Sequence, residues 1–210
     1  MNTERHADME RGLAKLPVLS GMNQPGRNGE ELATDEAAVW KRVLNYRLAR
    51  WLKPGRILET HAGLSISTVL YQHASPASET VSLAKGQTMP EDGAFDLIDV
   101  DPFGAPWKTL TRVRGLLAHD GVMMVSNGEA LAVWRNLRRQ QAFPTEFYGK
   151  RMPRWVRDEY LERVSDAAGV PVRWFYAFPT TIRVVLSNRD LPDWLWDRCP
   201  QWMWWLRRYA

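Results

Sequence analysis

The sequence has 210 residues, a length typical of one domain. It contains 28 Lys and Arg and 24 Asp and Glu, and the net charge of +4 permits a nucleic-acid partner without demanding one. A single cysteine, Cys199, excludes an internal disulfide framework and a cysteine-rich zinc site, and the scattered histidines show no metal-ligand spacing. No secretory signal and no apolar stretch of about 18 residues is visible, so we expect a soluble, cytoplasmic protein without a bound metal.

The first two thirds of the chain predict alternating helices and strands. Residues 1–33 carry several Pro and Gly, which interrupt any long element, and an N-terminal arm is expected there. Thr34 can cap a helix that starts at Asp35 and stops before Pro54-Gly55. The next predicted elements are a strand over 56–60, a turn over 61–63, a helix over 64–73 and a strand over 80–83.

The turn at residues 61–63 is a candidate ligand loop. A glycine between a strand and a helix lets backbone N–H groups point at a ligand, and Gly63 has no side chain to block its approach. The chain lacks the three spaced glycines of a dinucleotide fingerprint and the Gly-Lys-Ser/Thr of a phosphate loop. The alternative is that the turn only connects two elements.

Phe95 to Gly104 is the most informative stretch of the sequence. Its apolar residues suit a buried strand, while Pro102 removes a backbone donor and Gly104 permits a sharp turn, so strand pairing should stop there. Asp99 and Asp101 are two residues apart, which directs both side chains to one face of a strand. Open α/β proteins place their chemistry at the carboxyl ends of parallel strands, and these carboxylates are therefore candidate functional groups.

The remaining residues continue the alternation and then close it with a hairpin. Helices are predicted over 106–118, 129–141 and 153–168, with a turn at 119–121, a strand over 122–126 and a loop over 142–152. Strands over 172–177 and 181–186 are close enough to form an antiparallel pair. The predicted fold is α/β, with a mostly parallel sheet covered on both faces and one antiparallel strand near its C-terminal end.

These features together resemble the class I S-adenosylmethionine-dependent methyltransferases, which have a Rossmann-like sheet. Phe95-Asp-Leu-Ile-Asp-Val-Asp-Pro-Phe-Gly104 is similar to the motif of the tRNA guanine dimethyltransferase family, which modifies the exocyclic amine of a guanine. Weaker agreement is found in Ala62-Gly63-Leu64-Ser65-Ile66, in Tyr148-Gly149 with the helix after it, and in Thr181-Ile182-Arg183-Val184-Val185. The resemblance covers residues 56–187 and implies a methyltransferase-like domain over 34–190.

Two departures from that family are visible. The interval between the glycine turn and the acidic strand is short: only 80–83 fits a strand, and Ala84-Lys85 stands where the family has an acid for the ribose hydroxyls. The family's large C-terminal domain is replaced by residues 191–210, a tryptophan-rich tail. A chain that kept the fold and a nucleic-acid surface but lost the cofactor therefore remains an alternative to an enzyme.

The resemblance implies roles for particular residues. Asp101 would accept hydrogen bonds from the amine and then its proton, beside Pro102, and Phe103 would stack on the base, with Asp99 next to them. The cofactor S-adenosylmethionine would be held by Glu59, Thr60, His61, Ala62, Gly63, Ser65 and Asp99. Substrate or RNA contacts are assigned to Phe103, Asn127, Tyr148, Arg138, Arg139, Lys150, Arg151 and Arg154.

Each assignment has a structural alternative. Asp99 could face a basic residue, Glu59 could cap the following helix, His61 could simply be packed or solvated, and Asn127 could belong to an ordinary turn. Arg183 is interpreted as a salt-bridge residue rather than a substrate contact.

The basic side chains at 135–157 and the tryptophans near the C-terminus have alternatives of their own. The basic residues could track a phosphate backbone or form a solvated face. The tail tryptophans, from Trp194 to Trp205, are expected to pack on the body of the protein or on a second subunit of a homo-oligomer, more than to stack on bases.

The sequence thus predicts a methyltransferase for an exocyclic amine of a nucleic-acid base, with guanine in RNA as the first choice. The alternatives are the non-catalytic nucleic-acid-binding relative and an amine methyltransferase that acts on DNA, protein or a small molecule.

Overall fold

The structure is a computed structural model and describes residues 36–62, 66–84, 86–102, 104–127, 157–177 and 182–196. Its centre is a six-stranded sheet with the strand order β2-β1-β3-β4-β6-β5. The strands are β1 (Arg56–Glu59), β2 (Glu79–Ser82), β3 (Phe95–Val100), β4 (Leu117–Asn127), β5 (Val172–Ala177) and β6 (Ile182–Ser187). The helices are α3 (Glu36–Leu52), α4 (Ile66–Ala74), α5 (Trp107–Val113), α8 (Arg157–Ala168) and the short 3-10 turns η1 (Arg114–Leu116) and η2 (Asp193–Trp196).

The sheet is mostly parallel, as the sequence predicts. Strand β1 pairs in parallel with β2 and β3, and β3 pairs in parallel with β4. Strand β6 lies between β4 and β5 and runs antiparallel to both, so it is the reversed strand expected from the closing hairpin. The predicted α/β fold class is confirmed.

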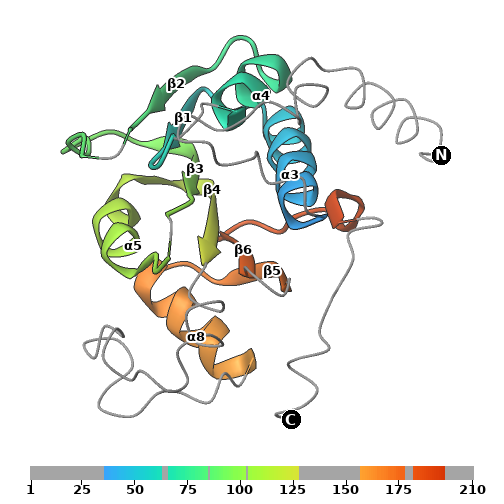
Figure 1. The fold of residues 1–210 in the computed structure, drawn as a ribbon, viewed down its shortest axis with the longest axis vertical. Helices are drawn as coiled ribbons and strands as arrows, with labels where there is room; N and C mark the ends of the chain where they lie inside the picture. Colours follow the sequence, from blue (N-terminus) through green and yellow to red (C-terminus); the bar gives the residue numbers. More distant parts are fainter. Residues whose placement is uncertain are drawn as a thin grey trace, which may run out of the picture.

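Helices cover both faces of this sheet (Figure 1). Helices α3 and α4 pack against each other on one face, whereas α5 and α8 pack against each other on the opposite face. Successive strand residues point to opposite faces. Ile57 and Leu97 therefore join the core under α3 and α4, while Leu58 and Ile98 join the core under α5 and α8.

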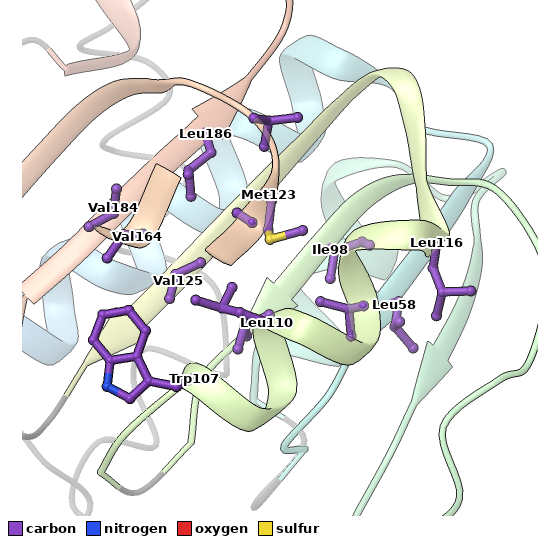
Figure 2. Packing of buried hydrophobic residues seen from close by; sticks show 14 of the residues in the cluster. Leu58, Ile98, Trp107, Leu110, Leu116, Met123, Val125, Val164, Val184 and Leu186 are labelled. Atoms are coloured by element: carbon purple, nitrogen blue, oxygen red, sulfur yellow. The ribbon is translucent and has the colours of Figure 1, made fainter. Parts of the chain in front are cut away.

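The core on the α5 side is the larger of the two apolar clusters. Figure 2 shows Trp107 and Leu110 of α5 against strand residues such as Ile98, Met123 and Val125. Near-complete burial of aliphatic and aromatic side chains of this size contributes about 1.5–3 kcal/mol each. Trp107 is the first residue of α5 and is buried, so this core holds the start of the helix that follows β3.

Glycines terminate two elements as predicted. Gly104 has φ of +112°, a backbone conformation that residues with a side chain rarely adopt, and it lies in the turn after β3. Gly169 has φ of +72° directly after α8, and its N–H bonds to the carbonyl of Ser165, which closes the helix.

Two neighbouring predictions, a helix end and a turn, are wrong. The expected helix over 106–118 ends earlier, and the expected turn at 119–121 is part of strand β4, which already begins at Leu117. Phe95 pairs with Leu117 whereas Leu97 pairs with Val122, so the residues between Leu117 and Val122 form an irregularity in the strand. The Asp-Gly pair that suggested a turn is accommodated by this bulge, with His119 and Asp120 exposed.

The interval between β1 and β3 is as short as the sequence indicated. In its described residues it contains α4 and β2 only, and β2 pairs with β1 alone, which makes it an edge strand. The helix predicted over 129–141 and the loop predicted over 142–152 lie outside the described residues. None of the helices in the described ranges is both long and apolar enough to span a bilayer.

The described start of the predicted tail packs on the sheet. Leu195 is fully buried, Trp194 and Trp196 lie against the core under α3, and the Trp196 ring stacks on Trp174 with centroids 4.5 Å apart. Packing is therefore confirmed for these two tryptophans, while Trp202, Trp204 and Trp205 lie outside the described residues.

Candidate active site

Polar side chains from four neighbouring strands meet at the carboxyl edge of the sheet. Glu59 ends β1 and is in register with Asp99 of β3 on one side and with Ser82 of β2 on the other. Asp101 follows the end of β3, and Ser126 lies near the end of β4, next to the paired residues Val100 and Val125. This is the edge at which open α/β sheets bind ligands.

Glu59 is buried, with 4% of its surface exposed, and accepts hydrogen bonds from two hydroxyl groups. Thr68 of α4 donates to Oε2 at 2.5 Å and Ser82 donates to the same oxygen at 3.2 Å. Burial, and then the negative charge of Asp99, raise the pKa of Glu59 from 4.5 to about 7. Glu59 is thus a carboxyl group that can be neutral or charged near pH 7.

Asp99 is the centre of a buried polar network. Its Oδ1 accepts a hydrogen bond from Arg183 Nη2 at 2.9 Å, and its Oδ2 accepts one from Asn45 Nδ2 at 3.0 Å and one from the Tyr71 hydroxyl at 2.5 Å. Arg183 also donates to Asn45 Oδ1 and to Ser126 Oγ, each at 2.6 Å. The network therefore joins α3, α4, β3, β4 and β6.

The arrangement of Asp99 is the structural alternative weighed from the sequence, a carboxylate that faces a basic residue. Asp99 is 0% exposed and Arg183 is 1% exposed, and they form an ion pair. The prediction that Arg183 is a salt-bridge residue is confirmed. The catalytic and cofactor roles of Asp99 stay predictions, and the network shows how it would orient its neighbours rather than reach a substrate.

Asp101 lies at the same edge of the sheet as Asp99 but is partly exposed to solvent. Its side chain is 26% exposed, and its Oδ2 accepts a hydrogen bond from the ammonium group of Lys41 on α3. Burial alone would raise the pKa of Asp101, but the charges of Lys41 and Arg183 and a hydrogen bond from Ser126 outweigh it, so the pKa lies below its usual value. Asp101 is consequently an anion at neutral pH.

The residues after β1 are held against β3. Thr60 donates its backbone N–H to the Asp99 carbonyl at 3.0 Å, and its hydroxyl lies 2.7 Å from His61 Nδ1. Burial lowers the pKa of His61, although the charges of Asp101 and Asp99 act in the opposite direction. Ala62 donates its N–H to the Leu83 carbonyl at 2.9 Å, so the start of the glycine turn is fastened to the end of β2.

The structure does not bring every predicted residue to this face. Asn127 is fully buried on the α5 side of the sheet, where its amide donates to the Tyr160 hydroxyl of α8 at 3.1 Å. Pro102 is half-buried beside Asp101. The remaining predicted residues, Gly63, Ser65, Phe103, Arg138, Arg139, Tyr148, Lys150, Arg151 and Arg154, lie outside the described residues.

Three residues at the site were missed from the sequence: Lys41, Asn45 and Tyr71. Lys41 and Asn45 lie four residues apart and therefore on the same side of α3. Asn45 and Tyr71 are both 0% exposed. Arg42 and Arg47 of the same helix are buried as well, and the local pattern that predicts this helix gives no sign of these polar partners.

Solved structures share this fold at low sequence identity. Trm1 from Pyrococcus horikoshii, in complex with S-adenosyl-L-methionine, is 16% identical, over 74% of this chain and 56% of its own, with a TM-score of 0.52. The O-methyltransferase TomG from Streptomyces achromogenes, in complex with SAM, is 17% identical, over 90% and 100%, with a TM-score of 0.53. The plantazolicin methyltransferase BpumL with SAH is 10% identical, over 88% and 97%, with a TM-score of 0.50.

The chain has the fold of a class I S-adenosylmethionine-dependent methyltransferase. It spans little more than half of the Trm1 chain. No protein-family model and no curated protein matches the sequence. Because Trm1 and an O-methyltransferase match with similar scores, the methyltransferase fold alone does not select between nitrogen and oxygen acceptors.

By their chemistry, the residues at this edge of the sheet would suit the methionine part of S-adenosylmethionine better than its ribose. A buried carboxyl group at the end of β1 can pair with an ammonium group. At the end of β2, Ser82 is engaged with Glu59, and the described residues that follow, Leu83 and Ala84, carry no carboxylate for the ribose. Among the described residues no group of His, Cys, Asp or Glu is arranged to hold a metal ion.

Proposed function

We propose that this chain is an S-adenosylmethionine-dependent methyltransferase that acts on an exocyclic amine of a nucleic-acid base, with guanine in RNA as the first candidate. The observation that carries the proposal is the position of Asp101. It follows the end of β3 in a methyltransferase fold, is anionic, and lies on the same edge as the buried carboxyl group of Glu59.

Glu59, Thr60, His61 and Ala62, with Gly63 and Ser65 after them, would hold the methionine end of the cofactor. When bound, S-adenosylmethionine supplies an electrophilic methyl group on a positively charged sulfur. An ammonium group beside Glu59 would favour the ionised carboxyl and offset part of its burial. Glu59 is therefore assigned to the cofactor ammonium group.

Asp101 would orient the acceptor amine. The lone pair of a guanine amine is delocalised into the ring, and hydrogen bonds accepted from its N–H groups favour the pyramidal, nucleophilic form. After it had received the methyl group, the amine nitrogen would be cationic and acidic. Even a carboxylate with a lowered pKa can then take the proton. Pro102 and Phe103 would place and stack the base.

An RNA partner is proposed from the basic residues between Arg135 and Arg157, which could contact phosphates. A second candidate is a non-catalytic, nucleic-acid-binding relative. It is supported by the absence of a carboxylate among the described residues at the end of β2, where the cofactor ribose would need one.

Cofactor binding separates the two candidates. Calorimetry of the purified chain should detect binding of S-adenosylmethionine and S-adenosylhomocysteine, with dissociation constants well below about 1 mM. Absence of heat from both ligands at that concentration would leave only the non-catalytic candidate.

Replacement of Asp101 tests its assigned role. Asp101→Asn should lower labelled-methyl transfer to total RNA by about 10²-fold or more, because the amide cannot accept the proton, while cofactor binding stays within a few-fold of the original value. Transfer to DNA and protein in parallel assays identifies the acceptor class. Asp120→Asn, an exposed change on β4, is the matched control and should have no effect. Equal rates in both variants would remove Asp101 from the mechanism.

A further inference from the structure

Lys41 makes a direct contact with the carboxylate that the proposed reaction uses. It lies on α3, and its ammonium group donates a hydrogen bond to Asp101 Oδ2 across 60 residues of sequence. The two side chains are 27% and 26% exposed, so the pair lies at the boundary between the buried network and solvent. A substrate amine that approaches Asp101 therefore approaches the Lys41 ammonium group as well.

The other charges around Asp101 are also balanced. The Arg183 guanidinium is paired with Asp99, and Glu59 has a pKa of about 7, so it is only partly ionised at neutral pH. In the described part of this edge, Asp101 consequently presents an ion pair and not an uncompensated negative charge. An isolated carboxylate would attract any cation, whereas a paired one offers hydrogen-bond acceptors with little net attraction for charge.

Acceptor amines differ in charge at neutral pH. Aliphatic amines, such as a lysine side chain or a polyamine, have pKa values near 10 and are ammonium ions. The exocyclic amine of a nucleobase is neutral. An ammonium ion placed at Asp101 would lie beside the Lys41 ammonium group. Two positive charges next to the same carboxylate in a partly desolvated site repel each other strongly.

We infer that Lys41 is a specificity-determining residue, which makes the site accept uncharged acceptor groups such as a nucleobase amine and reject aliphatic ammonium groups. This inference rests on the proposed function, because it assumes that acceptors bind at Asp101. It excludes lysine side chains and polyamines as substrates of the same site.

The test measures binding of butylammonium ion by ligand-observed NMR at constant ionic strength, with neutral butyramide as the reference ligand. Lys41→Met should bind butylammonium at least about tenfold more tightly than the original protein, because an attraction replaces a repulsion. Lys41→Arg keeps the positive charge and should bind it as weakly as the original protein. The exposed Lys108→Met is the matched control and should not change binding.

The double variant Lys41→Met, Asp101→Asn locates the effect. It should lose the tenfold gain, because the carboxylate that attracts the cation is gone. A Lys41 that only stabilised the fold would alter thermal unfolding and leave the ratio of butylammonium to butyramide affinity unchanged, and an unchanged ratio in Lys41→Met would overturn the inference.

Cofactor calorimetry on the same samples keeps the two hypotheses apart. If the original protein binds no S-adenosylmethionine, the proposed function fails and this inference fails with it. If the cofactor binds and Lys41→Met does not gain affinity for butylammonium, only the inference fails.

Discussion

Arg183→Met is expected to lower the free energy of unfolding by about 3–5 kcal/mol. The change leaves Asp99 fully buried without its cation and removes hydrogen bonds to Asn45 and Ser126. The loss should appear in urea unfolding at pH 7 as a lower midpoint with an unchanged dependence on urea concentration.

Two further variants assign this loss to the ion pair. The exposed Arg112→Met on α5 makes the same change of side chain and should alter stability by less than about 0.5 kcal/mol. Asp99→Asn in the Arg183→Met background removes the stranded charge, so the double variant should be more stable than the sum of the single changes predicts. Additive losses would mean that the two side chains do not act as a pair.

Glu59→Gln should stabilise the protein at neutral pH by about 3 kcal/mol, the free energy that corresponds to a pKa raised from 4.5 to about 7. Below pH 4.5 Glu59 is neutral in both the folded and the unfolded chain, and glutamine resembles it. Between pH 4.5 and about 7 the unfolded chain has released this proton and the folded chain has not, so the original protein loses stability as pH rises. Above that range the difference between the two proteins should be constant.

Urea unfolding of both proteins from pH 4 to pH 8 checks this prediction. The exposed Glu91→Gln makes the same change of side chain away from the site and is the control. If the free energies of unfolding of Glu59→Gln and the original protein differ by the same amount at every pH, the pKa of Glu59 is not raised and the prediction is wrong. Because an ammonium group prefers the ionised carboxyl, the same variant should bind S-adenosylmethionine more weakly, so stability and cofactor affinity should change in opposite directions.

The sequence predicts the elements of this fold well where the signal is local. Three such signals each span only a few neighbouring residues: the apolar run of β3, the glycine after α8, and the hairpin of β5 and β6. The structure has all three at nearly the expected positions. The turn predicted at 119–121 is wrong, because these residues form an irregularity within β4 that its pairing with β3 accommodates. A turn signal within a few residues carries no information about how those residues pair with a neighbouring strand.

The candidate site was predictable only in part, for a related reason. The carboxyl groups of Glu59, Asp99 and Asp101 follow from strand ends, which are local features. The partners of these groups come from distant segments: Arg183 is 84 residues from Asp99, and Lys41 is 60 residues from Asp101. A single sequence suggests that Arg183 forms a salt bridge, but it does not say with which acid. Lys41 gave no signal at all, since a lysine on a helix is normally solvated.

The position of β6 has a consequence for how the site is assembled during synthesis. Strand β6 lies between β4 and β5, although the ribosome makes it after both, and it carries Arg183. The Arg183 contact with Asn45 closes a loop of 138 residues. Such long-range contacts form late, because the chain loses the entropy of loop closure before the contact stabilises it. A nascent chain that has not yet released β6 holds Asp99 without its cation and lacks the strand that connects β4 to β5. Pulse-labelled chains arrested before residue 182 should therefore be protease-sensitive, and resistance should appear in one step once β6 has emerged.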